Sequence, residues 1–287
     1  MSGTPINRSD ITLPAEVSRE ILAKTQTDSA VMQLARNIAI PGRGVAIQTI
    51  TADPEASWVG ETEAKPVSPA SLATAMLQPY KLAVIVPFSN EFRRDADFLY
   101  QALVDRLPRA LATKFDATVV GSSAPGSNFT VLGGCTAQEI GTDAYAGLVE
   151  ANKDIASNGG DMNGIALAPA GKASLLGAVD LQGRPIFNTA TEGAVPYVLG
   201  APTVVGKGVA DTANNVVGIA GDWSQAIVGT VEGVKIDISD QATLVDADEN
   251  VINLFQQNMI AVRAEIEIGF VADDKCFNLL TSTPSES

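Results

Sequence analysis

The feature that most constrains this chain is a strict alternation of side-chain character in the sequence "QNMIAVRAEIEIGF". The alternate apolar positions are Ile260, Val262, Ala264, Ile266, Ile268 and Phe270. The intervening positions include the charged residues Arg263, Glu265 and Glu267. Successive side chains of a strand point to opposite faces, and this alternation runs over eleven residues. It therefore predicts one long strand with a single buried face.

A long helix is predicted upstream, in the segment that begins at Ser89 or Asn90 and ends at Gly121. Either of the two polar residues at its start is a suitable N-cap. The apolar residues that recur every four positions are Leu99, Leu103, Leu107, Leu111 and Phe115. They form the apolar stripe of an amphipathic helix, and Pro108 inside it predicts a kink near Val104. The helix and the long strand together favour an α+β fold.

Two strand-like runs, residues 44–51 and 80–89, flank a polar stretch that is rich in proline. The pattern predicts that they pair as one long hairpin, with its turn near residues 65–69. Pro79 and Pro87 place the second run at the edge of a sheet, because proline cannot donate a backbone hydrogen bond.

The N-terminal segment, residues 1–43, shows one apolar stripe and no core of its own. An isolated two-stranded hairpin is also only marginally stable in water. We therefore expect a neighbouring subunit to cover both the segment and the hairpin. Residues 141–239 form a second α+β unit of short helices and short strands, and residues 273–280 are predicted as a short closing helix.

Composition excludes several function classes. The chain of 287 residues carries 19 basic and 33 acidic residues, which gives a formal net charge of −14. This balance argues against an electrostatic grip on nucleic acid or on an anionic membrane surface. Histidine is absent, and the two cysteines, Cys135 and Cys276, form no metal-binding motif, so reduced thiols are favoured over a disulfide.

Targeting and membrane signals are also missing from the pattern. The chain has no run of about 18 apolar residues, which a membrane-spanning helix needs. Its first residues lack the basic and apolar regions of a secretion signal. We expect a cytosolic product without a membrane partner.

Four short motifs could carry chemistry, and each favours a structural interpretation. "GKAS" at 171–174 has Ala166 where a phosphate-binding loop needs glycine. "DADEN" at 246–250 lacks the glycine and late glutamate of a calcium loop. "GDWSQAIVG" has no histidine to activate its serine. Glu265 and Glu267 lie beside Arg263, which favours an ion-pair ladder over acid–base catalysis. We therefore predict no catalytic, cofactor or metal site and no enzyme activity.

The order of these pieces resembles a known family. Its most specific parts are "LPAEVSREIL", "WVGETEAKPVS", "KLAVIVPFSNEFRRDA" and "NMIAVRAEIEIGFVADDKCFNLL". From about Leu13 to Leu280 the chain is similar to the tailed-phage major capsid proteins of the Hong Kong 97 type. The resemblance implies four parts: an N-arm at 1–43, an E-loop hairpin at 44–89, a P domain with a spine helix at 90–140 and 240–287, and an A domain at 141–239.

The function that this resemblance implies is self-assembly into the icosahedral head shell of a virion, built from hexamers and pentamers. The shell encloses double-stranded DNA without sequence-specific binding and assembles in the cytoplasm of the bacterial host. Separate scaffolding, portal and cement proteins are further partners that the resemblance allows, and we expect no scaffolding region fused to this chain. The alternatives are an encapsulin-like nanocompartment shell protein and an unrelated α+β enzyme or binding module.

The resemblance also suggests contact residues. The E-loop residues expected to touch a neighbouring subunit are Trp58, Glu61, Thr62, Glu63, Lys65 and Pro66. Some family members join subunits through a lysine–asparagine bond assisted by a glutamate, and Asn258 and Glu265 match the last two positions. The lysine position is occupied by Thr62, and Lys65 lies about 10 Å further along a strand. We expect a shell without covalent crosslinks.

Overall fold

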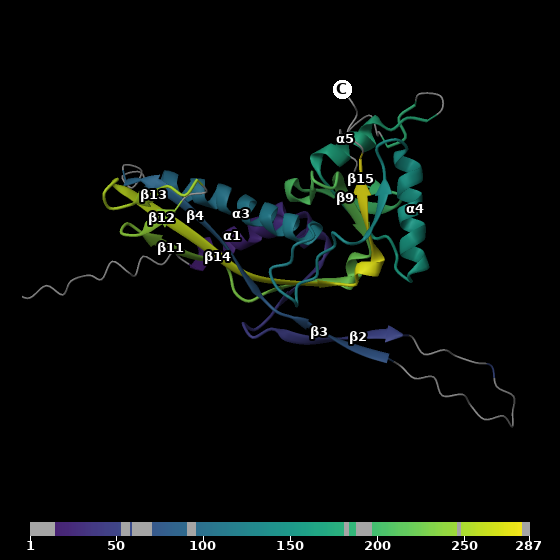
Figure 1. Ribbon diagram of the computed structural model, residues 1–287, viewed down its shortest axis with the longest axis horizontal. Coiled ribbons are helices and arrows are strands. Elements are labelled where there is room, and N and C mark those ends of the chain that lie inside the picture. Colours follow the sequence, from purple (N-terminus) through teal and green to yellow (C-terminus); the bar gives the residue numbers. More distant parts are fainter. Residues whose placement is uncertain are drawn as a thin grey trace, which may run out of the picture.

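The computed structural model describes residues 15–52, 58, 71–90, 96–180, 184–187, 197–245 and 248–282. Two sheets lie at opposite ends of the body, and a long helix, α3, lies along the first (Figure 1). The first sheet contains β1 (Arg36–Ala39), β4 (Tyr80–Ser89), β10 (Ala226–Thr230), β11 (Lys235–Ser239) and β14 (Met259–Ala272). Two hairpins, β2–β3 and β12–β13, form separate two-stranded sheets.

The predicted long strand is β14, and it holds the first sheet together. It pairs antiparallel with β4 along one edge and with β10 and β11 along the other. The alternate apolar residues from Ile260 to Phe270 are all buried, with at most 3% of each exposed. The predicted buried face is therefore confirmed.

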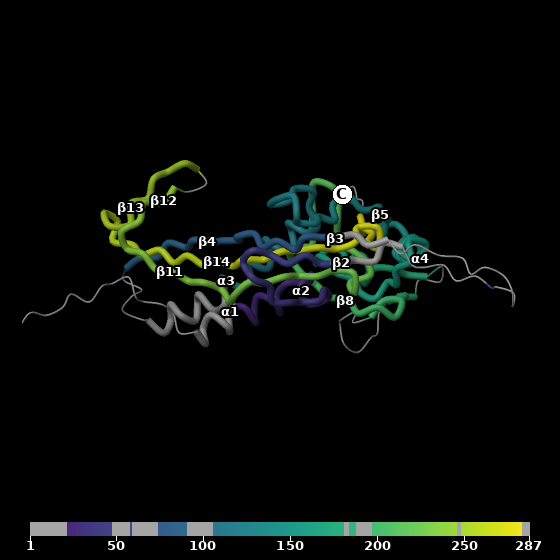
Figure 2. Tube along the Cα trace, turned by 90° about the horizontal axis from the view of Figure 1, so that it is seen from below, coloured from purple at the N-terminus to yellow at the C-terminus, as the bar shows by residue number. Residues whose placement is uncertain are grey.

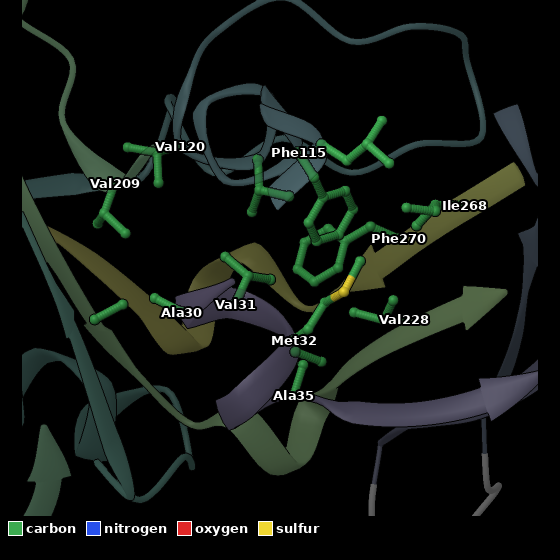
Figure 3. Packing of buried hydrophobic residues seen from close by; sticks show 14 of the residues in the cluster. Ala30, Val31, Met32, Ala35, Phe115, Val120, Val209, Val228, Ile268 and Phe270 are labelled. Carbon is green, nitrogen blue, oxygen red and sulfur yellow. The ribbon is translucent and has the colours of Figure 1, made fainter. Parts of the chain in front are cut away.

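Helix α3 (Ala96–Val120) covers this face and ends one residue before Gly121, as predicted. Leu107, Leu111 and Phe115 of the predicted stripe are buried. The ring centroids of Phe115 and Phe270 lie 6.3 Å apart in an edge-on arrangement, in the cluster shown in Figure 3. The side chains of Leu99 and Leu103 lie outside the described residues, as do residues 91–95, so the predicted cap is not observed.

The N-terminal segment docks on its own chain, which corrects the expectation that a neighbour covers it. It contains α1 (Ala15–Asp28), α2 (Ala30–Leu34) and β1. Ala30, Val31 and Met32 of α2 lie in the main core, next to Phe115 and Phe270 in Figure 3. β1 pairs in parallel with β10. Residues 30–39 of this segment thus pack inside the subunit.

A buried carboxylate connects this segment to α3. Asp116, only 1% exposed, accepts hydrogen bonds from the Ser29 hydroxyl at 2.5 Å and from the backbone N–H of Ala30 at 2.9 Å. The N–H of Val31 is a weaker third donor at 3.4 Å. Burial raises the pKa of Asp116 to about 6, and the three hydrogen bonds oppose that rise.

The hairpin prediction is wrong in its second strand. β2 (Val45–Ala52) pairs with β3 (Ser71–Leu77), whereas β4 pairs with β14. Gln78 and Pro79 lie between β3 and β4 and belong to neither strand. The alternate apolar residues of β4 therefore pack in the first sheet and not in the hairpin. Within the described part of the chain β14 is the sole neighbour of β4, which confirms the edge position of Pro87.

The second sheet has six strands, and α4 (Ala144–Ser157) and α5 (Pro169–Gly177) pack against it through one shared cluster of buried residues, which includes Leu148 and Leu175. Its order is β5 (Thr136–Glu139), β15 (Phe277–Thr281), β9 (Val216–Gly221), β6 (Gly164–Leu167), β8 (Ala201–Val205) and β7 (Tyr197–Val198). The predicted helix at 273–280 is wrong: a single 3₁₀ turn, Asp274–Cys276, leads into β15. Since β15 is buried on both faces, its run of apolar residues carries no alternation.

The position of β5 and β15 also moves a boundary. Residues 90–140 and 240–287 were expected to form one unit around the long helix. β14 and α3 do so, but β15 pairs with both β5 and β9 in the second sheet. β5 and β15, which lie in the expected unit around the long helix, therefore belong to the second sheet.

The Asp116 cluster predicts a specific dependence of stability on pH. Because the folded pKa of about 6 lies above the ordinary 3.8, the folded chain binds this proton more tightly than the unfolded chain. The stabilisation is complete below about pH 3.8 and is lost as the pH rises through about 6. The stability of the wild type relative to Asp116→Asn should thus increase as the pH falls from about 7 to about 4.

Urea unfolding of the unassembled chain between these pH values measures that difference. At pH 7 the substitution leaves donors without a full partner and should cost about 1–3 kcal/mol. Asp161→Asn, at an exposed aspartate, is the control and should follow the wild type. Parallel profiles for wild type and Asp116→Asn would contradict the assignment.

Candidate assembly interface

The β2–β3 hairpin extends from the body as an arm, apart from both sheets (Figure 1). The two strands pair from Val45↔Leu77 to Ala52↔Ser71, and no other described strand joins either edge. Val45 and Met76 are 36% and 42% exposed. An uncovered two-stranded ribbon of this kind is marginal alone, so the arm is a candidate surface for contact with another chain.

The root of the arm is held in a socket, formed by Ile40, Gly229 and Gly269 around the buried side chain of Leu77. A Cβ atom at Gly229 would lie 2.7 Å from both Leu77 Cδ2 and Ile40 Cδ1. At Gly269 it would lie 2.5 Å from the backbone oxygen of Gln78. Glycine is required at both places because the arm approaches the sheet so closely.

Backbone geometry and hydrogen bonds fix the root further. Gly44 has a φ of +78°, in the left-handed region that favours glycine, and donates its N–H to the Pro41 carbonyl at 2.8 Å. The Tyr80 hydroxyl accepts from the N–H of Asn128 at 3.1 Å, and Gln78 Oε1 accepts from Asn128 Nδ2 at 2.8 Å. The arm therefore leaves the body in a defined direction.

The predicted contact residues lie beyond this root. Trp58 is fully exposed, with a relative exposure of 105%, as an aromatic side chain reserved for a partner would be. Glu61, Thr62, Glu63, Lys65 and Pro66 lie outside the described residues. Their role in contact with a neighbour stays a prediction.

The two residues that match the crosslinking motif are not brought together within one chain. Asn258, at a φ of +53°, accepts a hydrogen bond from Asn90 Nδ2 at 3.0 Å. Glu265 lies seven residues further along β14, roughly 20 Å away along a strand. There its carboxylate lies 3.2 Å from Arg263 Nε. Any joint chemistry of the pair would have to combine different subunits.

The charged face of β14 forms the ladder of ion pairs that the sequence favours. Arg263 also contacts Asp237 of β11 at 2.7 Å, and Lys81 of β4 lies 3.6 Å from Glu267. Partly exposed pairs of this kind contribute at most about 1 kcal/mol each. Two of these ion pairs connect β14 with the neighbouring strands β4 and β11, so their role is structural.

A second protruding hairpin was missed from the sequence. It consists of β12 (Thr243–Val245) and β13 (Val251–Asn253) and stands away from β14 in Figure 2. Val245 and Val251 are 66% and 64% exposed, and Phe255, which follows β13, is 78% exposed. The signal was present as apolar residues on both sides of "DADEN". Single exposed apolar side chains are common, but three on one protrusion indicate a contact surface.

Two of the four short motifs take part in a turn and in helix packing. Asp222 accepts hydrogen bonds from the N–H and hydroxyl of Ser224 and from Asn163 Nδ2, which shapes a turn. A Cβ at Gly171 would meet the Val217 carbonyl oxygen at 2.4 Å, so this glycine permits α5 to pack on β9.

The remaining chemistry of the described residues is limited. Cys135 and Cys276 are free thiols, and burial raises the pKa of Cys135 to about 12. No three metal-binding side chains gather anywhere in the described ranges. Within the same ranges, every helix is too short or too polar to cross a membrane.

Comparison with known proteins decides the family. The sequence profile of the Phage capsid family matches residues 10–281. The chain belongs to the phage capsid family. It is 31% identical to the probable major capsid protein gp17 of Mycobacterium phage L5, over 92% of this chain and 86% of that protein. It is 24% identical to the major capsid protein of Staphylococcus phage 80alpha, over 94% and 85%.

Solved structures confirm the Hong Kong 97-type α+β fold of this phage capsid family member. A chain from Mycobacterium phage Adephagia matches with a TM-score of 0.70 at 20% identity, covering 90% of this chain and 91% of that one. A chain from Microbacterium phage Oxtober96 matches with a TM-score of 0.70 at 21% identity, covering 98% and 96%. Neither the nanocompartment alternative nor the unrelated enzyme or binding module is favoured.

The socket predicts a coupling between two substitutions. Gly229→Ala should destabilise the chain by about 1–3 kcal/mol, because its Cβ overlaps Leu77. Leu77→Ala should cost about 2–5 kcal/mol through the cavity that it leaves. In the double variant the new methyl group enters the vacated space, so the combined cost should be smaller than the sum.

Denaturant unfolding of the four chains measures this coupling. Gly134→Ala is the matched control, since a Cβ there meets nothing within 4 Å, and it should shift stability by less than about 0.5 kcal/mol. Strictly additive costs would show that Leu77 and Gly229 do not share one space.

Proposed function

We propose that this chain is the major capsid protein of a tailed double-stranded DNA phage and assembles with copies of itself into the icosahedral head shell. Family membership and the names of the relatives support this function. The observation that carries it is the arm: its root packs closely against the first sheet, and among the described strands β2 and β3 pair only with each other. Such an arm is suited to lie on a neighbouring subunit.

The geometry supports assembly by many weak contacts. The arm would serve as the E-loop, and α3 with β14 as the spine and long strand of the P domain. The second sheet with α4 and α5 would form the A domain, and residues 1–43 the N-arm. Repeated contacts of the same surfaces around closed symmetry axes add up, so no single contact has to be strong.

We further infer that the shell forms without catalysis and without a covalent lock. The described residues provide no catalytic cluster, and Thr62 stands where a crosslinking lysine is expected. The product would be part of the virion after assembly in the host cytoplasm. It would enclose DNA without reading its sequence, alongside separate scaffolding, portal and cement proteins.

Removal of the outer arm tests the proposal. Replacement of residues 53–70 by a short glycine-serine turn leaves the root and both sheets intact, so the chain should fold but fail to form shells in electron micrographs. Glu150→Gln, at an exposed residue of α4, is the control and should assemble normally. Normal shells from the shortened chain would contradict the role of the arm.

The absence of a covalent lock has a direct readout. Purified shells boiled in denaturant should give a single band near 29.8 kDa on a gel. A ladder of multiples of that mass would show crosslinks between subunits. Nuclease-protected DNA inside native particles distinguishes a phage head from a shell that holds cargo protein.

A further inference from the structure

The strongest unassigned feature is a groove lined with cations in an acidic protein. It lies between α3, the C-terminal corner of α1 and the segment after β8, and has a volume of about 650 Å³. Its charged lining residues are Asp28, Arg109, Lys114 and Lys207. We call it the α3 groove. Among the described lining residues three cations thus face one carboxylate, although the whole chain carries 33 acidic and 19 basic residues.

The described solvent-facing side of α3 near the groove also carries more basic than acidic side chains. The exposed residues between 106 and 118 are Arg106, Arg109, Ala110, Thr113 and Lys114. The acid in that stretch, Asp116, points inward and is satisfied by Ser29 and the start of α2. Arg106 lies one helical turn from Arg109 on this exposed side, so a further cation adjoins the groove.

The one acid among the described lining residues, Asp28, does not neutralise the charge of the groove. Asp28 lies 3.9 Å from Arg109 Nε, at the limit of an ion pair, and both side chains are accessible to solvent. Of the pairs that the structure records across the groove, none involves Lys114 or Lys207. Like charges gathered in this way repel one another, and an anion in the groove would relieve that repulsion.

We propose that the α3 groove binds the phosphate backbone of double-stranded DNA, an inference that rests on the proposed function. The cations are exposed, on long flexible side chains, and arranged along an open groove. Contacts of this type position a nucleic acid without reading its bases. A pocket for one small anion would instead surround it with buried donors.

The charge balance favours DNA over a protein partner. The acidic part of the arm, residues 59–70, carries Glu61 and Glu63 but also Lys65, which leaves a single net negative charge. Double-stranded DNA presents one negative charge per about 1.7 Å of its axis. The overall negative charge of the chain still repels DNA elsewhere, so the groove provides a local contact on a surface that otherwise does not retain DNA.

Crosslinking in DNA-filled particles of the full chain provides the first test. After treatment with formaldehyde, mass spectrometry should find nucleotide adducts on Lys114 and Lys207 more often than on the exposed lysines Lys153, Lys235 and Lys275. An adduct frequency no higher than at these controls, including none anywhere, overturns the inference. Crosslinks from the groove lysines to the peptide with residues 59–70 in place of DNA also overturn it.

Matched charge variants provide the second test. Arg109→Gln/Lys114→Gln/Lys207→Gln removes three groove cations, and Lys153→Gln/Lys235→Gln/Lys275→Gln removes three exposed cations outside the groove. For three phosphate contacts, the affinity of the full chain for a short DNA duplex should fall about 40-fold between about 50 and 200 mM salt. The groove variant should lose this salt dependence, and the control variant should retain it.

The outcomes separate the two proposals. If both variants form normal shells and show the same salt dependence as the wild type, the DNA contact is overturned while the capsid function stands. If the wild-type chain forms no shells under any condition, the proposed function fails irrespective of the DNA measurements. Normal shells with salt-dependent binding lost only in the groove variant support both.

Discussion

Burial of one face of β14 against α3 is the interaction on which the rest of the structure depends. The Phe270 ring lies 6.3 Å from Phe115 of α3 and 6.0 Å from Phe129 of the following loop. α2 inserts Met32 beside the same rings, as Figure 3 shows. β4, β10 and β11 are held in register by pairing with this strand. Loss of that face would remove the common partner of three strands and two helices.

The arm inherits its direction from the same strand. Gly269 of β14 and Gly229 of β10 are paired residues, and together they form the floor beneath Leu77. A flexible joint would let the arm sample many directions, and ordering it on a neighbour would then cost conformational entropy. A seated root avoids much of that cost. Packing inside one subunit would therefore favour the contact between subunits that we propose for the arm.

The parts of the fold that could be predicted from the sequence are those with a long, unbroken period. β14 repeats its alternation over eleven residues, and α3 repeats leucine at helical spacing over several turns, so neither pattern fits another structure. The surface of the candidate site was harder to predict. Exposed Val245, Val251 and Phe255 have no period, because these side chains do not line a buried face of the described chain.

The errors have a common physical origin in long-range competition. From the sequence, both β3 and β4 could pair with β2. β4 pairs with the edge of β14 instead, so β3 becomes the partner of β2. The run at 277–280 is short and apolar, which suits a buried helix or a strand buried on both faces equally well. The sequence of the N-terminal segment shows an apolar stripe but does not show which surface the segment packs against. In each case the deciding contact lies far away in sequence.

The position of β15 has a consequence for how the protein is made. Among the described strands β15 comes last in chain order, yet it lies between β5 and β9 inside the second sheet. A ribosome therefore releases every other strand before this sheet can close. Chains that stop early leave β5 without its partner and an open edge on β9. Such fragments cannot present the finished surface of the second sheet, so a growing shell has a structural basis for rejecting them.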